Sequence, residues 1–292
     1  DGFRTSHEIQ KIEVWDQKDL GEMLDMDAAQ AFRNRALNPE HPVLRGTAQN
    51  GDIFFQAREA CNSYYDAFPA IVEEYMNKVN AKIGTNYGLV NYYGAPDADR
   101  VIIAMGSVCD TIDETIDYLM ARGEKVGVVK VRLYRPFCKE ALIEAIPDTV
   151  KSIAVLDRTK EPGSLGEPLY LDVVAALKGS KFDSVKITSG RYGLGSKDTT
   201  PAQIIAVFKN LALPMPKNHF TVGIVDDVTF TSLPQEEEIA LGGEGMFEAK
   251  FYGLGADGTV GANKNSVKII GDNTDKHCQA YFSYDSVSYT HL

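Results

Sequence analysis

The clearest pattern of hydrophobic and polar positions lies between residues 93 and 212, where short apolar runs alternate with segments of helical spacing. Continuous apolar runs are typical of strands buried on both faces, and apolar residues three or four positions apart indicate amphipathic helices. The predicted strands are 101–104, 126–131, 152–156 and 185–188, and the predicted helices are 108–119, 139–146, 166–177 and 201–211. This alternation predicts one complete α/β domain with a parallel sheet covered on both faces.

The segment before residue 93 is rich in helix formers and shows no alternation of strands and helices. Between residues 53 and 79, apolar positions recur every three to four residues, which predicts a helix pair packed on a core. Pro69 is expected to interrupt that pattern. Residues 1–92 are therefore predicted to finish a domain that begins upstream.

A linker that contains two prolines, residues 213–218, follows the complete domain. Beyond it, residues 221–231 are predicted to be extended and 247–252 to form a strand. A glycine-rich turn, an apolar helix and a strand at 279–284 are expected next. This order predicts the first part of another α/β domain, so that the complete domain lies between two partial ones.

The chain has 292 residues, with 30 Lys and Arg against 41 Asp and Glu, for a formal net charge of −11 at pH 7. Proteins that wrap nucleic acid or bind anionic membrane surfaces need basic excess, so the charge argues against both classes. No apolar run approaches the roughly 18 residues of a membrane span, and no signal peptide is visible. We therefore expect a cytoplasmic protein with no nucleic-acid and no membrane partner.

The four cysteines lie far apart, at Cys61, Cys109, Cys138 and Cys278, and no CxxC motif occurs. Local ligand spacing therefore provides neither a zinc site nor an iron–sulfur cluster, and reduced thiols are expected. The five histidines have no Ser or Cys motif beside them and form no HxxxH pair. We expect no catalytic residue and no metal ligand within this chain.

The most distinctive local motif is a glycine-rich loop between a predicted strand and a predicted helix. Glycines let the backbone turn tightly and approach an anion, and the free amides of a helix N-terminus favour phosphate. The candidate phosphate-binding residues are Gly253, Gly255, Gly258, Thr259, Asn263 and Lys264. Two alternatives stay open: a tight turn without a ligand, and a dinucleotide site that uses Asp285 after the next strand.

Two further loops, 157–163 and 190–198, follow predicted strands, where open α/β sheets bind ligands. Arg191 and Lys197 could serve such a ligand or could bind acidic residues of a neighbouring domain. We favour the interdomain contact. Asp226 and Asp227 are expected to form a turn, because nothing around them suits a metal ion.

Seven longer motifs are distributed over nearly the whole chain. They are DGFRTSHE at 1–8, RGTAQN at 45–50, NYYGAPDA at 91–98, VRLYRPF at 131–137, LDRTKEPG at 156–163, GRYGLGSKD at 190–198 and the glycine-rich loop at 253–264. Together and in this order they resemble the pyruvate:ferredoxin (flavodoxin) oxidoreductases, from residue 1 to about 286.

The resemblance implies a longer parent enzyme that converts pyruvate and coenzyme A into acetyl-CoA and CO2 and passes the electrons to ferredoxin or flavodoxin. It implies thiamine diphosphate, Mg2+ and [4Fe-4S] clusters in that parent, bound outside this chain, and a homodimeric assembly. The other expected partners are the remaining domains of the same polypeptide. The chain alone is expected to lack the catalytic centre and to be inactive.

The resemblance also divides the chain. Residues 1–92 resemble the C-terminal part of the pyrimidine-type thiamine-enzyme domain, 93–212 a transketolase C-terminal-like domain, and 220–292 the N-terminal part of a third domain that contacts coenzyme A. The six loop residues are then expected to contact coenzyme A phosphates. Residues 287–292 depart from the family pattern and are expected not to be native chain. The alternative function is a non-catalytic module that binds coenzyme A or a nucleotide, or a scaffold.

Overall fold

The computed structural model describes residues 8–12, 14–44, 46, 48–234, 236–239, 241 and 245–282, which fall into two compact units. The sheet unit contains the residues before 14, 92–131 and those from 142 onward, and the helical unit contains 14–91 and 132–141. The motif at residues 1–7, Asp285 and residues 287–292 lie outside the described residues. What the sequence predicts for them stays a prediction, and so do the three proposed domain boundaries.

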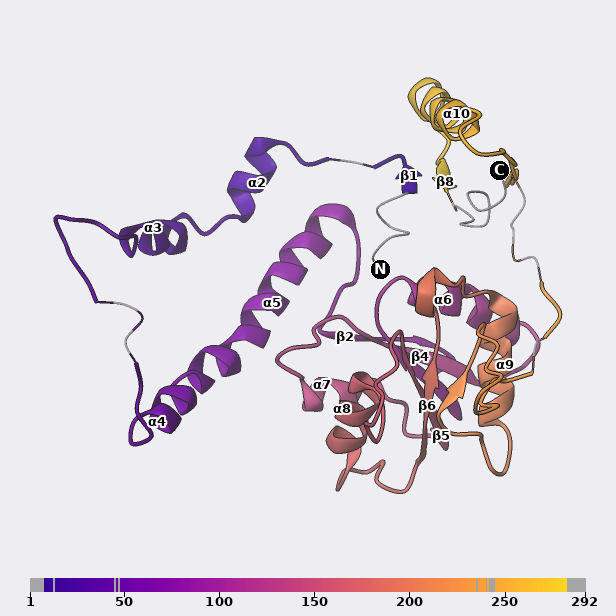
Figure 1. Cartoon of the computed structure of the whole chain (residues 1–292), viewed down its shortest axis with the longest axis horizontal. Helices are drawn as coiled ribbons and strands as arrows, with labels where there is room; N and C mark the ends of the chain where they lie inside the picture. The colour runs from indigo at the N-terminus through magenta and orange to yellow at the C-terminus, as the bar shows by residue number, and fades with distance from the viewer. Residues whose placement is uncertain are drawn as a thin grey trace. The chain divides into compact units, whose positions relative to one another are not determined.

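A six-stranded sheet with the order β2-β4-β3-β5-β6-β7 forms the centre of the sheet unit (Figure 1). The strands are β2 (Val90–Gly94), β3 (Arg100–Ala104), β4 (Val126–Val131), β5 (Ser152–Asp157), β6 (Lys186–Arg191) and β7 (Phe220–Thr221). β3 pairs in parallel with both β4 and β5, and parallel pairing continues through β6 to β7. The predicted parallel sheet is confirmed, and the order of its parallel strands is that of a doubly wound fold.

β2 is an edge strand that the sequence pattern does not predict. The amide of Ala95 donates to the Val126 carbonyl and the amide of Arg132 to the Leu89 carbonyl, so β2 runs antiparallel to β4. Gly94 allows this close approach, because a Cβ there would lie 2.6 Å from the Cα of Gly127. The strand carries polar and aromatic residues, which do not form an apolar run.

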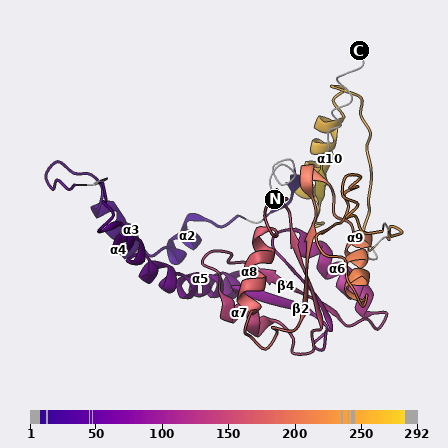
Figure 2. The same ribbon diagram turned by 60° about the horizontal axis from the view of Figure 1, so that its bottom comes forward.

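Helices cover both faces of the sheet, as the sequence predicts. α6 (Val108–Met120) and α9 (Pro201–Leu211) pack against each other on one face. α7 (Lys139–Ala145) and α8 (Pro168–Leu177) lie together on the other face (Figures 1 and 2). α9 begins at Pro201, where the helix 201–211 is predicted to begin, and Thr200 before it makes no side-chain capping hydrogen bond.

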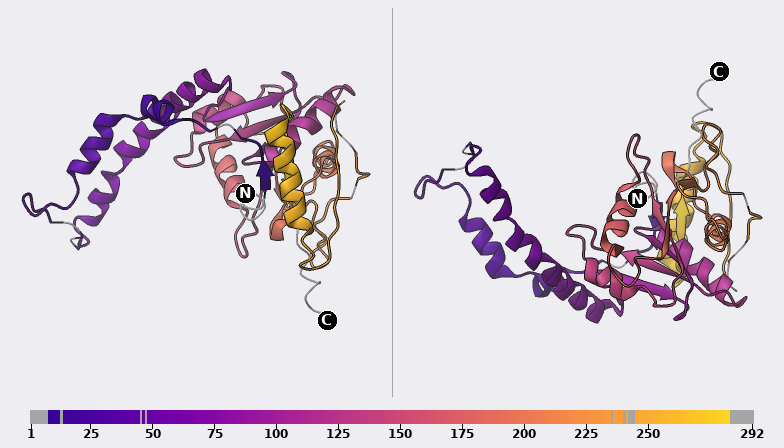
Figure 3. Two further views of the ribbon diagram at one scale, coloured as in Figure 1. Left: turned by 90° about the horizontal axis from the view of Figure 1, so that it is seen from above. Right: turned by 90° about the horizontal axis from the view of Figure 1, so that it is seen from below.

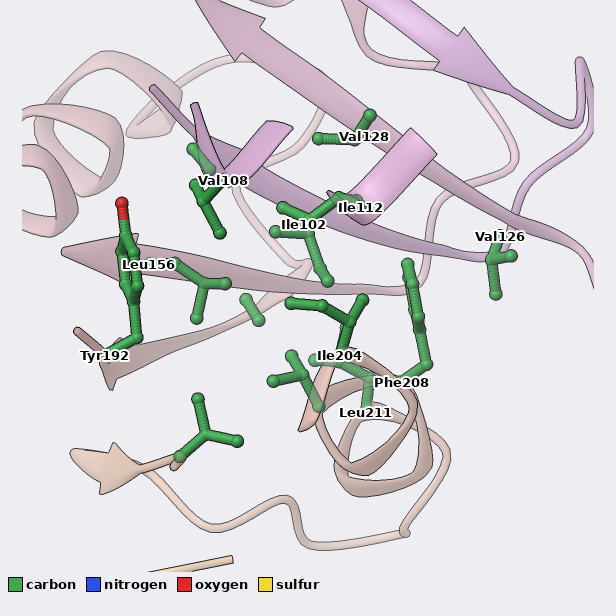
Figure 4. Packing of buried hydrophobic residues seen from close by; sticks show 14 of the residues in the cluster. Ile102, Val108, Ile112, Val126, Val128, Leu156, Tyr192, Ile204, Phe208 and Leu211 are labelled. Carbon is green, nitrogen blue, oxygen red and sulfur yellow. The ribbon is translucent and has the colours of Figure 1, made fainter. Parts of the chain in front are cut away.

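The core depends on the alternation of side chains along the central strand β3. Ile102 and Ala104 belong to a buried cluster with Phe208 and other residues of α6 and α9 (Figure 4). Val101 and Ile103 are equally buried, and because successive side chains of a strand point to opposite faces, they belong to the other side of the sheet. From Val101 to Ala104, both faces of β3 are therefore apolar and covered.

The described residues between 14 and 91 of the helical unit form four helices. They are α2 (Gln17–Met23), α3 (Met26–Asn34), α4 (Phe54–Glu59) and α5 (Asn62–Ile83). α4 and α5 confirm the predicted helix pair, but the core predicted beneath them is not found among the described residues, because neither helix has a buried residue. The interruption predicted at Pro69 is also wrong, because α5 runs through that residue to Ile83, before Gly84. A proline in a helix interior removes one hydrogen bond and can bend a helix without ending it when the apolar stripe continues in phase. The break between the pair lies at Ala60 and Cys61.

One strand near the beginning of the described chain packs with a strand and a helix near its end. β1 (Glu8–Gln10) pairs antiparallel with β8 (Gln279–Tyr281), with Ile9 opposite Ala280, and α10 (Thr259–Asn273) contacts both strands (Figure 3). β8 confirms the beginning of the strand predicted at 279–284.

Two extended segments predicted after the linker differ from the structure. Residues 247–252 have no regular structure, and Phe247 and Tyr252 are 91% and 89% exposed. An apolar segment forms a stable strand only beside a partner strand, and the described residues place none next to it. Only Thr221 of the segment 221–231 is in a strand, because the chain turns at Gly223, with a φ of 69°, and again around Asp226.

The buried cluster on the α9 face predicts a large effect of truncating one of its aromatic side chains. Phe208 is 2% exposed, and we expect Phe208→Ala to lower the free energy of unfolding by about 3 to 5 kcal/mol through lost burial and a cavity. Phe247→Ala, at a side chain 91% exposed, is the matched control and should change it by less than about 0.5 kcal/mol. Urea unfolding of both variants followed by circular dichroism measures this, and equal effects would contradict the described core.

Candidate functional site

The glycine-rich loop leads directly into α10. Gly258 is the residue before the helix, with a left-handed φ of 86°, and Thr259 is the first helical residue. Asn263 and Lys264 follow in the second turn of α10. The structure therefore confirms the turn and the helix after it, but not the strand predicted before it.

The carboxylate of Asp257 lies at the centre of this loop. It accepts hydrogen bonds from the backbone amides of Leu254 and Thr259, both at 2.9 Å. These bonds lower the pKa of Asp257, with the Thr259 amide contributing most, followed by the Thr259 hydroxyl and the Leu254 amide. The loop thus places a negative charge of its own at the N-terminus of α10, where the helix dipole favours one.

The backbone geometry of the loop itself explains why glycine occupies each of the three positions. Gly255 and Gly258 have φ values of 57° and 86°, which side-chain-bearing residues rarely adopt. A Cβ on Gly253 would lie 2.7 Å from Oγ1 of Thr259 and 2.9 Å from Oδ1 of Asp257. The backbone therefore requires these glycines with or without a ligand.

The first turns of α10 still offer groups that suit an anion. The amides of Val260 and Gly261 have no acceptor within the helix, because the first turn of any helix lacks one. Lys264 adds a cation, and its ammonium lies 5.4 Å from the centroid of the Phe282 ring. A phosphate can accept from these amides and pair with Lys264, but it must then lie near the Asp257 carboxylate.

A second cluster of charged side chains lies at the carboxyl edge of the sheet. Asp157 ends β5 and is buried, and its carboxylate accepts the amides of Leu169 at 3.0 Å and Tyr170 at 3.1 Å. Burial raises the pKa of Asp157, and the two hydrogen bonds oppose that rise. Asp157 therefore caps the N-terminus of α8, where amides otherwise lack partners.

Glu167 precedes Pro168 at the start of α8, and its side chain is 1% exposed. Its carboxylate lies 2.6 Å from Nε of Arg191 and accepts the hydroxyl of Ser189 at 2.9 Å. Burial alone raises the pKa of Glu167, but the hydrogen bonds from Arg191 and Ser189 outweigh it and hold the pKa below its ordinary value. Arg191 also donates to the His219 carbonyl at 3.0 Å, so one ion pair joins β6, α8 and the segment before β7.

The interdomain role favoured for Arg191 is wrong, because its guanidinium is bound to Glu167 within the same domain. Arg158 donates from Nε to the Gly193 carbonyl at 3.1 Å, so the two charged loops bind each other. Tyr192 between them is buried, which raises its pKa to about 12. Lys197 is exposed, and its contact with a neighbouring domain stays a prediction.

The predicted turn at Asp226 is confirmed. Its carboxylate accepts the amides of Val228, Thr229 and Thr231 at 2.8 to 3.0 Å and the hydroxyls of both threonines. These bonds, led by the amide of Thr229, hold the pKa of Asp226 far below its ordinary value.

Within the described ranges, His, Cys, Asp and Glu form no group of three or more suited to a metal ion. The same described residues include no helix that is both long and apolar enough to cross a membrane.

Sequence reasoning missed two carboxylates that organise these sites. Asp257 precedes Gly258 and Thr259, a pattern typical of a turn in which the side chain accepts a nearby amide. Glu167 stands directly before Pro168, and an acidic residue before an N-terminal proline is typical of a helix start. Its partner Arg191 lies 24 residues away, and no local sequence pattern indicates that the two side chains pair.

Two family models match separate parts of the chain. Residues 1–77 match the model described as pyruvate flavodoxin/ferredoxin oxidoreductase, thiamine diphosphate binding. Residues 98–204 match the model described as pyruvate:ferredoxin oxidoreductase core domain II. The second match covers most of the parallel sheet and the helices on its two faces.

Curated relatives align with nearly the whole chain. It is 62% identical over 287 residues to a pyruvate-flavodoxin oxidoreductase of Enterobacter agglomerans. It is 59% identical over 286 residues to a pyruvate:ferredoxin oxidoreductase of Moorella thermoacetica. Each alignment covers 98% of this chain and 24% of the relative, so the chain spans about a quarter of the length of these relatives.

One similar solved structure is a 2-oxoglutarate:ferredoxin oxidoreductase from Magnetococcus marinus with 2-oxoglutarate, coenzyme A and succinyl-CoA bound. It has 20% sequence identity and a TM-score of 0.31 to this chain. The match covers 48% of this chain and 22% of that one.

The buried ion pair predicts a large effect of neutralising one partner. We expect Glu167→Gln to lower the free energy of unfolding at pH 7 by about 3 kcal/mol, because Arg191, whose side chain is 12% exposed, then lacks its counter-charge. Glu236→Gln, in the exposed pair with Lys209, is the matched control, with an expected loss of about 0 to 1 kcal/mol.

The same ion pair predicts a pH dependence. Because the folded-state pKa of Glu167 lies below its ordinary value of 4.5, its contribution is complete above that pH and is lost as the pH falls through the folded-state pKa. The stability difference between the parent chain and Glu167→Gln should therefore shrink below about pH 4.5. Urea unfolding at pH 7, 5, 4 and 3.5 measures it, and a difference that is constant or grows on acidification would refute the assignment.

Proposed function

Because this chain belongs to the pyruvate:ferredoxin (flavodoxin) oxidoreductase family, we propose that it forms part of a longer polypeptide that oxidises pyruvate. The reaction of that polypeptide converts pyruvate, coenzyme A and an oxidised carrier into acetyl-CoA, CO2 and the reduced carrier. The carrier is ferredoxin or flavodoxin, the two carriers that the relatives' names give. The observation that carries the proposal is identity of 59% to 62% over 98% of the chain.

The chain itself contributes framework to that enzyme in this proposal and does not hold the catalytic centre. Residues 1–77 match a family model described as thiamine diphosphate binding. The proposal takes these residues as the end of that domain. It assigns thiamine diphosphate, Mg2+, the [4Fe-4S] clusters and the pyruvate-binding site to segments of the longer polypeptide outside this chain.

The part of the reaction assigned to this chain is a contact with coenzyme A. The six residues Gly253, Gly255, Gly258, Thr259, Asn263 and Lys264 would hold its phosphates at the start of α10. The support is the combination of unpaired helix amides with the nearby cation of Lys264. Coenzyme A supplies the thiol that accepts the acetyl group, and the role of this chain is to bind and orient the phosphate end.

The assembly proposed for the longer enzyme is a homodimer in the cytoplasm.

The second candidate function is a non-catalytic module that binds coenzyme A or a nucleotide, or a scaffold. The feature that favours a scaffold is Asp257, because its carboxylate already occupies the position in which a ligand phosphate would accept the Thr259 amide. Binding measurements separate the two.

Activity in a longer context tests the main proposal. The purified 292-residue chain should show no reduction of viologen dye with pyruvate and coenzyme A. The Moorella thermoacetica relative, with its aligned segment replaced by the 286 aligned residues of this chain, should retain that activity, because 59% of the aligned positions are identical. Activity of the short chain alone, or an inactive chimera that folds and binds its cofactors, would contradict the proposal.

Calorimetry tests the coenzyme A contact in the same chimera. Lys264→Ala should weaken coenzyme A binding about tenfold, because one charged hydrogen bond to phosphate is lost. Lys268→Ala, one turn further along α10, is the matched control and should leave the Kd within about twofold. Equal affinities for the Lys264→Ala variant and the parent would refute the assignment of Lys264.

A further inference from the structure

A continuous apolar stripe runs along α5 in the helical unit. Its members recur at the spacing of one helix face, over about three turns. They are Phe68, Ile71, Val72, Tyr75, Met76 and Val79. Together with Tyr87 and Arg132 they line an open groove of about 530 Å³.

Among the described residues of the helical unit, none encloses the groove. Phe68 and Ile71 are 43% and 48% exposed. No described residue between 14 and 91 is buried, although this span contains four helices. Contiguous apolar surface of this kind is typical of an interface, because a soluble chain rarely leaves it in water.

One charged side chain lies at the edge of the groove. Arg132 stacks on Tyr87, with its guanidinium carbon 4.6 Å from the ring centroid, and donates from Nε to the side chain of Asn91 at 2.8 Å. These two contacts fix the guanidinium in place. The surface is therefore apolar along its length, with a cation at a defined position, and a complementary partner is apolar with an acidic group at that position.

We propose that the α5 groove is an obligate docking surface for another segment of the same polypeptide, outside the quarter that this chain represents. The proposal rests on the proposed function, which places the chain in a longer enzyme. The relatives supply the occupant, because three quarters of their length lies outside the aligned region. A covalently linked segment also has a far higher effective concentration than a separate protein. Its contact face is apolar and carries a carboxylate or helix C-terminus opposite Arg132.

Thiol labelling compares the groove in the two contexts. Ile71→Cys places a thiol in the groove, and Asn77→Cys places one on the opposite, exposed side of the same helix. Each variant is made in the 292-residue chain and in the chimera with the Moorella thermoacetica relative, and labelling by a maleimide at that peptide is followed by mass spectrometry. We expect labelling at position 71 to be at least about tenfold slower in the chimera than in the short chain, with a smaller change at position 77.

Two outcomes overturn the proposal. Equal labelling rates at position 71 in both contexts would show that the groove faces solvent in the longer enzyme. Slow labelling in the short chain that depends on its concentration would show that a second copy covers the groove. Because labelling does not need catalysis, a chimera without activity but with protected position 71 contradicts the proposed function and leaves the docking surface supported.

A charge-introducing substitution gives a second measurement. Ile71→Asp should lower the melting temperature of the chimera by several degrees and leave that of the short chain within about one degree. Asn77→Asp on the exposed side is the control and should change neither. Equal shifts from Ile71→Asp in the two contexts would refute the docking surface.

Discussion

The parallel sheet depends on having both of its faces removed from water at once. In β3, Val101 and Ile103 belong to one side and Ile102 and Ala104 to the other, so neither layer of helices alone could stabilise the strand. This requirement explains why α6 and α9 on one face and α7 and α8 on the other must assemble together. At the carboxyl edge, Asp157 and the Glu167–Arg191 pair hold the start of α8 against β5 and β6.

In the helical unit, by contrast, the helices form without a second apolar surface to cover them in the part of the chain that the structure describes. Its helices form from local signals, such as the Asp16 capping box before α2 and the left-handed Gly84 after α5, and do not enclose a core among the described residues. Helix formation needs only a few adjacent residues, whereas burial needs a second apolar surface. One chain can therefore contain a complete core in one unit and, in the other, described helices with formed apolar faces and no buried residue.

The sequence was sufficient to predict a helix, strand or turn wherever the residues of that element alone carried its hydrophobic pattern or turn motif. The four central strands and the helices between them follow from apolar runs and helical spacing, and the Asp226 turn follows from its neighbours. β2 was missed because its partner β4 lies more than 30 residues away and its own residues are polar and aromatic. A strand was wrongly predicted at residues 247–252 for a related reason: an apolar segment becomes a strand only when a second strand lies beside it. At the candidate site, the glycines and the helix start were visible, but Asp257 as an internal anion and Arg191 as a buried partner depend on three-dimensional contacts.

The two edges of the sheet have a consequence for association. At one edge β7 offers only two residues, and at the other β2 runs against the direction of the rest. Thr221 of β7 also pairs with Ser232, so this edge offers an incoming strand almost no free template, whereas β2 could still pair with a strand of either direction. The β7 edge is therefore protected from joining edge to edge with a neighbouring sheet, which matters where strands are locally concentrated, as in a large multidomain enzyme.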